Sequence, residues 1–269
     1  MKVQEIKINE APDFPQDIYK YRSWNGYQKT IITEKTVFMA KPNSFEDEKD
    51  CKLQKRYDLM TNRDIFNKYV DLSKEINLTW NRQQHRQHAK KMSKNSSMKD
   101  KNYVKKLQEQ TFLEFNERFG VLSLTANPSN LKMWAKYSDD GKGFCVGFDP
   151  KIMFPFLGGG GKVIYCEELP IIFHNDDFHT EHVKQVFSKE DIWSFEEEYR
   201  THRFYKVPAT DSERCIVLPV EAYKEIIFGW AMPENIIKEI MQACLNENLC
   251  VQFKKTEKQN NKIIIRSII

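Results

Sequence analysis

The order of the predicted elements constrains the fold of this chain more than any other feature of its sequence. Two short strand-like segments, 18–23 and 37–40, come before a long helical stretch from 56 to about 118. Apolar residues in that stretch recur mainly every three or four positions, which is typical of amphipathic helices. The rest of the chain mixes strands and helices without strict alternation, which favours an α+β fold over a parallel sheet. We therefore expect a mixed, mainly antiparallel sheet core with a helical insertion at 56–118.

Beyond the insertion, β-branched or ring-rich runs predict strands, and runs with helical spacing predict helices. Strands are expected at 120–125, 143–148, 163–166, 196–205, 214–220, 223–228, 249–253 and 262–268, and helices at 131–137, 178–188 and 233–246. A length of 269 residues fits one domain that carries an insertion. We expect an N-terminal arm at 1–16, where two prolines interrupt the chain, and a single α+β domain at 17–269.

The six cysteines argue against a metal centre. No two of them are separated by two residues, and none lies near a pair of histidines at ligand spacing, so we expect no metal. Cys145, Cys215 and Cys250 lie in apolar runs and are predicted to be buried thiols of a reducing compartment. The first residues contain no apolar run, and no stretch is long enough to span a bilayer, so we expect neither a leader peptide nor a membrane span. We expect a cytoplasmic protein without a membrane partner.

The formal charge of +4 is unevenly distributed. Residues 81–106 contain nine Lys and Arg against the single acid Asp100, with few aromatic residues among them. One interpretation is the solvated face of a helix, which the composition favours. The other is a contact surface for a phosphate backbone, whose affinity would fall with salt.

Four short blocks of sequence carry a family resemblance. They are Tyr19-Lys20-Tyr21-Arg22-Ser23, the segment 38–50, the pair 133–137 and 143–148, and the segment 193–200. Taken in order, with Ile-Ile-Phe-Gly at 226–229, they resemble the bacterial family catalogued as domain of unknown function 2971. Three positions depart from that family's pattern: Glu46 and Glu48 replace an Asn and a Pro, and Gly141 replaces a common His.

The last block contains a Glu-x-Glu pair. On a strand, Glu196 and Glu198 would direct both carboxylates to one face, and Arg200 would continue the row. This pattern resembles the Glu-x-Glu of ADP-ribosyltransferases, in which a carboxylate stabilises positive charge at a sugar carbon. The resemblance implies NAD as substrate, with Glu198 as the catalytic carboxylate and Glu196 as its partner. The alternative is a solvated strand face with Glu–Arg pairing.

The same resemblance implies cofactor-binding residues on the early strands. Arg22 would hold the pyrophosphate, because its fork-shaped cation suits phosphate oxygens. Tyr21, Ser44 and Tyr137 are the further candidates for contacts to NAD or a nucleotide-like ligand. Arg22 can instead be a structural cation, paired with Asp47 or Asp50.

Two other functions stay open. A nucleic-acid-binding protein or nuclease would use residues 81–106, with Asp47, Asp50, Glu196 and Glu198 as magnesium ligands. A non-catalytic partner in a multi-protein defence module would use its aromatic surface. The leading expectation is an ADP-ribosyltransferase-like enzyme in a toxin or phage-defence setting, acting on a protein or nucleic-acid acceptor.

Overall fold

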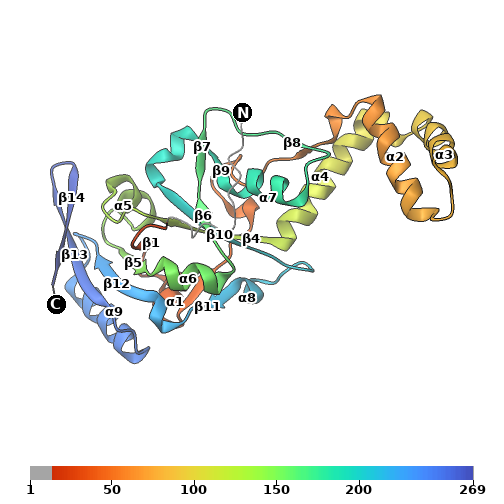
Figure 1. The fold of residues 1–269 in the computed structure, drawn as a ribbon. Helices are drawn as coiled ribbons and strands as arrows, with labels where there is room; N and C mark the ends of the chain where they lie inside the picture. Colours follow the sequence, from red (N-terminus) through yellow and green to blue (C-terminus); the bar gives the residue numbers. More distant parts are fainter. Residues whose placement is uncertain (1–13, 269) are drawn as a thin grey trace.

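The computed structural model describes residues 14–268, so most of the predicted arm at 1–16 lies outside the described residues. Its centre is an eight-stranded sheet, in which only the β12–β13 pair is parallel (Figure 1). The strand order is β14 (Lys262–Ser267), β13 (Gln252–Gln259), β12 (Tyr223–Phe228), β5 (Phe144–Phe148), β1 (Ile18–Arg22), β4 (Phe119–Thr125), β10 (Glu198–Phe204) and β6 (Gly161–Lys162). The expected α+β fold with a mainly antiparallel sheet is confirmed.

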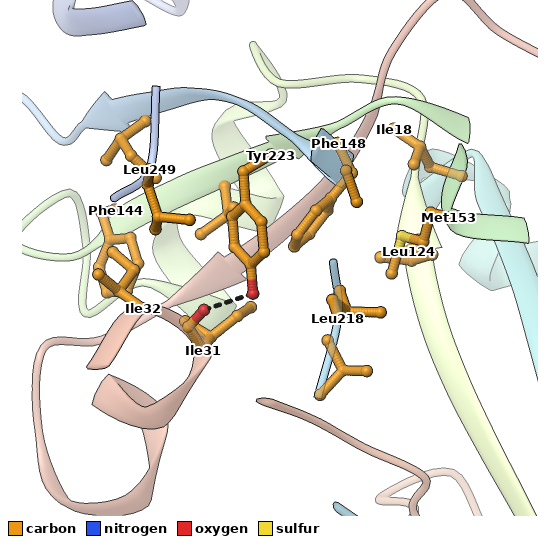
Figure 2. Close-up of a cluster of buried hydrophobic side chains, with 14 of the residues drawn as sticks. Ile18, Ile31, Ile32, Leu124, Phe144, Phe148, Met153, Leu218, Tyr223 and Leu249 are labelled. Carbon is orange, nitrogen blue, oxygen red and sulfur yellow. Dashed lines mark hydrogen bonds between the residues drawn. The ribbon is translucent and has the colours of Figure 1, made fainter. Parts of the chain in front are cut away.

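The larger core covers one face of this sheet, which we call the large-core face. Helices α1 (Thr30–Thr33), α6 (Pro150–Leu157) and α9 (Glu234–Asn246) contribute apolar side chains to it. Figure 2 shows Tyr223 within this core, where its hydroxyl donates a hydrogen bond to the Ile31 carbonyl at 2.8 Å. The labelled members are Ile18, Ile31, Ile32, Leu124, Phe144, Phe148, Met153, Leu218, Tyr223 and Leu249.

A smaller cluster covers part of the opposite face, which we call the α5 face after helix α5 (Leu131–Tyr137). Successive side chains of a strand point to opposite faces, so Tyr19 and Tyr21 leave the large core and pack against Trp134 of α5. Asn130 accepts hydrogen bonds from the first backbone amides of α5, which fixes where this helix begins. The α5 face is therefore the side of the sheet on which β1 presents its rings.

Helix α6, which follows the expected strand at 143–148, was not predicted. Asp149 is the N-cap and accepts a hydrogen bond from the Lys151 amide, while Pro150 takes the first helical position. The helix ends at Gly158, whose φ of 94° suits a glycine C-cap. Both end signals were present in the sequence.

The helical segment 62–118, which we call the helical arm, projects from the sheet (Figure 1). It consists of α2 (Asn62–Ile76), α3 (Arg82–Lys94) and α4 (Lys101–Arg118), and α4 leads directly into β4. Capping boxes begin α2 and α3, at Thr61 and Asn81 respectively. The two helices contact each other at Ser73 and His85, whose Oγ and Nδ1 atoms are 2.9 Å apart, and at Phe66, whose ring lies under Arg86. In Figure 1, α2 and α3 lie at the end of the arm farthest from the sheet.

The remaining elements are short. Three two-stranded pairs are β2 (Thr36–Phe38) with β11 (Cys215–Val217), β3 (Lys55–Arg56) with β8 (Ile172–Phe173), and β7 (Ile164–Cys166) with β9 (Ser188–Glu190). The other helices are α7 (Phe178–Phe187), α8 (Asp211–Arg214), and the 3-10 turns Gly26–Lys29, Pro42–Ser44, Tyr57–Leu59, Ser97–Lys99, Asp191–Glu196 and Val220–Ala222. Within residues 14–268, no helix is both long and apolar enough to cross a membrane.

The cysteine prediction is correct for one residue and wrong for two. Cys145 is buried in the sheet, but Cys215 and Cys250 are exposed. Cys215 lies on the short strand β11, where alternation buries the neighbouring Ile216 instead. Cys250 lies in the turn between α9 and β13.

Candidate functional site

A buried cluster of charged side chains lies beside the start of β10. Arg200 is completely buried, and it grips Glu198 through two hydrogen bonds, Nε to Oε1 at 2.7 Å and Nη2 to Oε2 at 2.9 Å. The same Nη2 donates to Asp50 Oδ2 at 2.7 Å. Such a fork-to-fork pairing satisfies a buried guanidinium well. The cluster is therefore a specific structure and differs from the solvated strand face that was the alternative prediction.

Lys189 of β9 is the centre of the cluster. Its Nζ lies 2.5 Å from Glu196 Oε2, 3.0 Å from Glu198 Oε2 and 3.3 Å from Asp50 Oδ2. Three carboxylates and two cations are thus enclosed together, and all five residues are buried. Each charged group is stabilised by the opposite charges around it, because burying a charge without a partner costs much free energy.

The charged groups in this cluster shift one another's pKa values. Burial alone would raise the pKa of Glu198, but Arg200 and Lys189 outweigh it and lower that pKa to about 2. Burial would lower the pKa of Lys189, but the surrounding carboxylates raise it above its ordinary value. Glu198 is therefore ionised and Lys189 protonated at neutral pH.

Tyr137 connects the cluster to the surface. Its hydroxyl donates to Glu196 Oε1 at 2.7 Å, while 37% of the residue is exposed. Beside it, the Lys136 ammonium lies 4.1 Å from the centre of the Trp193 ring and 2.9 Å from a carboxylate oxygen of Glu46. Tyr137 is the member of this hydrogen-bonded chain that a molecule in solvent could contact.

The structure brings together three of the predicted site residues, Glu196, Glu198 and Tyr137. The geometry expected for the Glu-x-Glu pair was nevertheless wrong. Glu196 ends a 3-10 turn, and Glu197 adopts a left-handed conformation with φ 45°, so β10 begins only at Glu198. The carboxylates of Glu196 and Glu198 meet because both bind the ammonium of Lys189, and not because they share a strand face.

The sheet separates Arg22 from these carboxylates. The register aligns Tyr19 with Thr125 and Thr125 with Glu198, so the side chains of Tyr19 and Glu198 lie on one face. Arg22 follows Tyr19 by three residues and is directed to the other, large-core face, where it is aligned with Phe144. Within residues 14–268 it forms no ion pair, so the alternative pairing with a carboxylate of 47–50 is wrong. Burial lowers its pKa to about 10.

The other two predicted ligand contacts are also apart from the cluster. Tyr21 lies on the α5 face, but its hydroxyl donates to the Asn127 carbonyl at 2.8 Å. Ser44 is exposed at the end of a 3-10 turn and donates to the Lys41 carbonyl at 2.7 Å. Lys189, the central residue, was not predicted, since it lies on a three-residue strand with no motif around it. In the sequence, the only indication of the site was the pair Glu196 and Glu198, two positions apart.

A second charged feature lies on α3. Arg82, Arg86, Lys90 and Lys94 follow one another at intervals of four residues and are all exposed, so they form one stripe along the helix. We call these four residues the α3 stripe. At 1.5 Å per residue it extends over roughly 18 Å. None of the four forms an ion pair with a residue from 14 to 268.

A shallow hollow of about 900 Å³ lies beside this stripe, between α2 and α3. It is lined by Phe66, Arg82, Gln83, Arg86, Gln87 and Lys90. The guanidinium of Arg86 lies over the Phe66 ring, 5.6 Å from its centre, which holds that cation in place. The hollow therefore combines fixed positive charge with amide groups able to donate hydrogen bonds.

Neither a family model, nor a curated protein, nor a solved structure matches this chain. Within residues 14–268, no group of His, Cys, Asp and Glu has the arrangement of a metal site. Asp50, Glu196 and Glu198, three of the four predicted magnesium ligands, surround the Lys189 ammonium, and Asp47 does not contact it. The buried cluster and the α3 stripe are the two charged features of the structure that bear on function.

Proposed function

We propose that this chain binds nucleic acid through the helical arm, with the α3 stripe against the phosphate backbone. The single observation that carries the proposal is the stripe itself: four exposed cations in register, without an acidic partner in the described chain. Like charges at i and i+4 destabilise a helix by about 0.2–0.5 kcal/mol per pair. Three such pairs cost about 1 kcal/mol in total, and a bound polyanion would reverse that cost.

The charge distribution supports the same proposal. Residues 62–118 contain thirteen Lys and Arg against seven Asp and Glu, a net +6, whereas the whole chain carries +4. The rest of the chain is therefore slightly acidic, at −2. Because the arm projects from the sheet (Figure 1), its positive field is presented to a partner apart from the acidic body.

The surroundings of the stripe favour a phosphate backbone over a bilayer. The inner side of α3, at His85 and Ala89, is buried, so the helix has no free apolar face to insert into lipid. The flanking amides of Gln83 and Gln87 can donate to phosphate oxygens. Stacking rings are few, with Phe66 lying beneath Arg86, which favours contacts to a duplex over stacking on single strands.

The test is fluorescence anisotropy with labelled duplex DNA, duplex RNA and single-stranded DNA. The variant Arg82→Gln/Arg86→Gln/Lys90→Gln/Lys94→Gln should lose most of the duplex affinity. A matched control removes four exposed lysines of the body, Lys142, Lys151, Lys206 and Lys238, and changes the net charge equally. The control should bind like the native chain. Equal losses in both variants, or no binding by the native chain, would contradict the proposal.

We propose NAD cleavage as a second candidate, because the structure brings Glu196, Glu198 and Tyr137 together. Glu198 is held ionised, as stabilisation of a positively charged sugar carbon requires. Support is limited to this half of the expected site. Arg22 lies on the large-core face, so the Lys136 ammonium beside Tyr137 is the cation that could meet a pyrophosphate.

NAD consumption by the purified protein tests this second candidate. Tyr137→Phe removes the hydroxyl that donates to Glu196 but leaves Lys189 beside that carboxylate, so the variant should still fold and should release nicotinamide more slowly. Glu198→Gln should abolish release, with circular dichroism used to check that it folds. No nicotinamide release by the native chain, or equal release by all three proteins, would eliminate this activity.

A further inference from the structure

Strand β14 forms one edge of the eight-stranded sheet, and no described strand pairs with its outer side. In Figure 1 it lies with β13 at the margin of the molecule. The opposite edge, β6, has only two residues, Gly161–Lys162. The long edge of this sheet is therefore β14, and it is the edge able to accept another strand.

The hairpin fixes which backbone groups of β14 point outward. β13 and β14 are joined by the two residues Asn260 and Asn261, and Gln259 is aligned with Lys262 beside this turn. In such a hairpin the pair next to the turn exchanges hydrogen bonds, and bonded and non-bonded pairs then alternate. The amide of Ile268 donates to the Phe253 carbonyl at 3.1 Å, as this alternation requires. Ile263, Ile265 and Ser267 consequently direct their N–H and C=O groups away from β13.

Apart from Lys262 beside the turn, the sequence of β14 does not protect this edge. It reads Lys-Ile-Ile-Ile-Arg-Ser, with no proline, and its register with β13 contains no bulge. Arg266 is held by an ion pair with Glu257 of its own hairpin at 2.9 Å. Proteins usually blunt a long apolar edge with prolines, bulges or free charges, since such an edge recruits other strands. An unprotected edge of this kind points to a strand partner.

We propose that the partner is a second copy of this chain, paired antiparallel through β14 about a two-fold axis at Ile265. Ile265 then exchanges both backbone hydrogen bonds with Ile265 of the second copy, and Ile263 does so with Ser267. All three outward residues are satisfied in this register. The pairing is self-complementary, as a two-fold interface requires.

Side chains agree with the same register. Lys262 lies opposite Ile268 of the second copy, and Arg266 lies opposite Ile264, so no like charges face each other. Ile263 and Ile265 already pack against the cluster on the α5 face. Across the axis Ile265 meets Ile265 of the second copy, and Ile263 lies opposite Ser267 and diagonal to Ile265, which extends that apolar layer through the dimer. Two sheets would thereby join into one.

Sedimentation velocity over a concentration series tests the proposal with the full chain. Ile265→Pro removes one outward N–H and no bond within the hairpin, because Ile265 and Thr256 form a non-bonded pair. Ser267→Pro removes another outward N–H. Each variant should weaken dimerisation at least tenfold and keep the native circular dichroism spectrum. Ile265→Val, which leaves the backbone intact, should stay dimeric.

Two results would overturn the inference. One is a native chain that stays monomeric up to its solubility limit. The other is a folded Ile265→Pro variant that dimerises as tightly as the native chain, which would place the interface elsewhere. A dimer that is lost in both proline variants and kept in Ile265→Val supports it. The helical arm is not involved, so this outcome is independent of nucleic-acid binding.

Discussion

Replacing Lys189 by methionine should destabilise the fold strongly. The change leaves Glu198 and Asp50 with Arg200, but Glu196 keeps only the hydrogen bond from Tyr137. Breaking a buried ion pair on one side costs about 3–5 kcal/mol, because the other charge stays buried without compensation. Since the Tyr137 hydroxyl still compensates Glu196 in part, we expect about 3 kcal/mol.

Urea unfolding followed by far-UV circular dichroism measures this loss through the transition midpoint at constant slope. The matched control is Lys136→Met, whose partner Glu46 has a side chain that is 76% exposed, so the loss should stay near or below about 1 kcal/mol. Adding Glu196→Gln to Lys189→Met should restore part of the stability by removing the uncompensated charge. A loss below about 1 kcal/mol for Lys189→Met, or no recovery in the double variant, would refute the account of the cluster.

Two further predictions concern stability in acid and the end of a helix. The pKa values of His182 and His202 are lowered by burial to about 3 and about 4, from 6.5, so these rings favour the neutral form in the fold. The stability that these neutral rings give is complete above pH 6.5 and declines as the pH falls towards their pKa values in the fold. Between pH 6.5 and 4.5, the free energy of unfolding should therefore fall less for His182→Phe than for the native chain. The same pH profile in both proteins would count against protonation of His182 as a cause of acid destabilisation. Asp149→Ala removes the N-cap of α6 and should lower the free energy of unfolding by about 1 kcal/mol, measured by thermal unfolding. An unaltered melting temperature would show that this cap is dispensable.

Local signals predicted much of the fold. The helix at 131–137 and the strand at 223–228 have the expected bounds, because a cap, turn residues and apolar spacing mark them within a few positions. Helix α9 begins just after Pro233, as expected for a proline at a helix start. Helix α6 was missed although Asp149 and Pro150 signal a helix as well as the end of a strand.

The candidate site was less predictable, since its geometry depends on long-range partners. Whether Arg22 and Glu198 share a face depends on the registers of β1, β4 and β10, and no local pattern fixes these. Lys189 of β9 belongs to the site only through its contacts with Glu196 and Glu198, which no local pattern indicates. The spacing of the cations in the α3 stripe can be read from the sequence. That they are exposed and form no ion pair with a described residue follows only from the structure, in which the helical arm projects from the sheet.

The most direct test of nucleic-acid binding is the salt dependence of duplex DNA affinity. Each cation that neutralises a phosphate contributes about 0.9 to the slope of log K against log salt concentration. If all four residues of the α3 stripe contact phosphates, the slope of the native chain should exceed that of the four-glutamine variant by about 3.6, and the body-lysine control should keep the native slope. Identical slopes for the native chain and the stripe variant would contradict the proposed function.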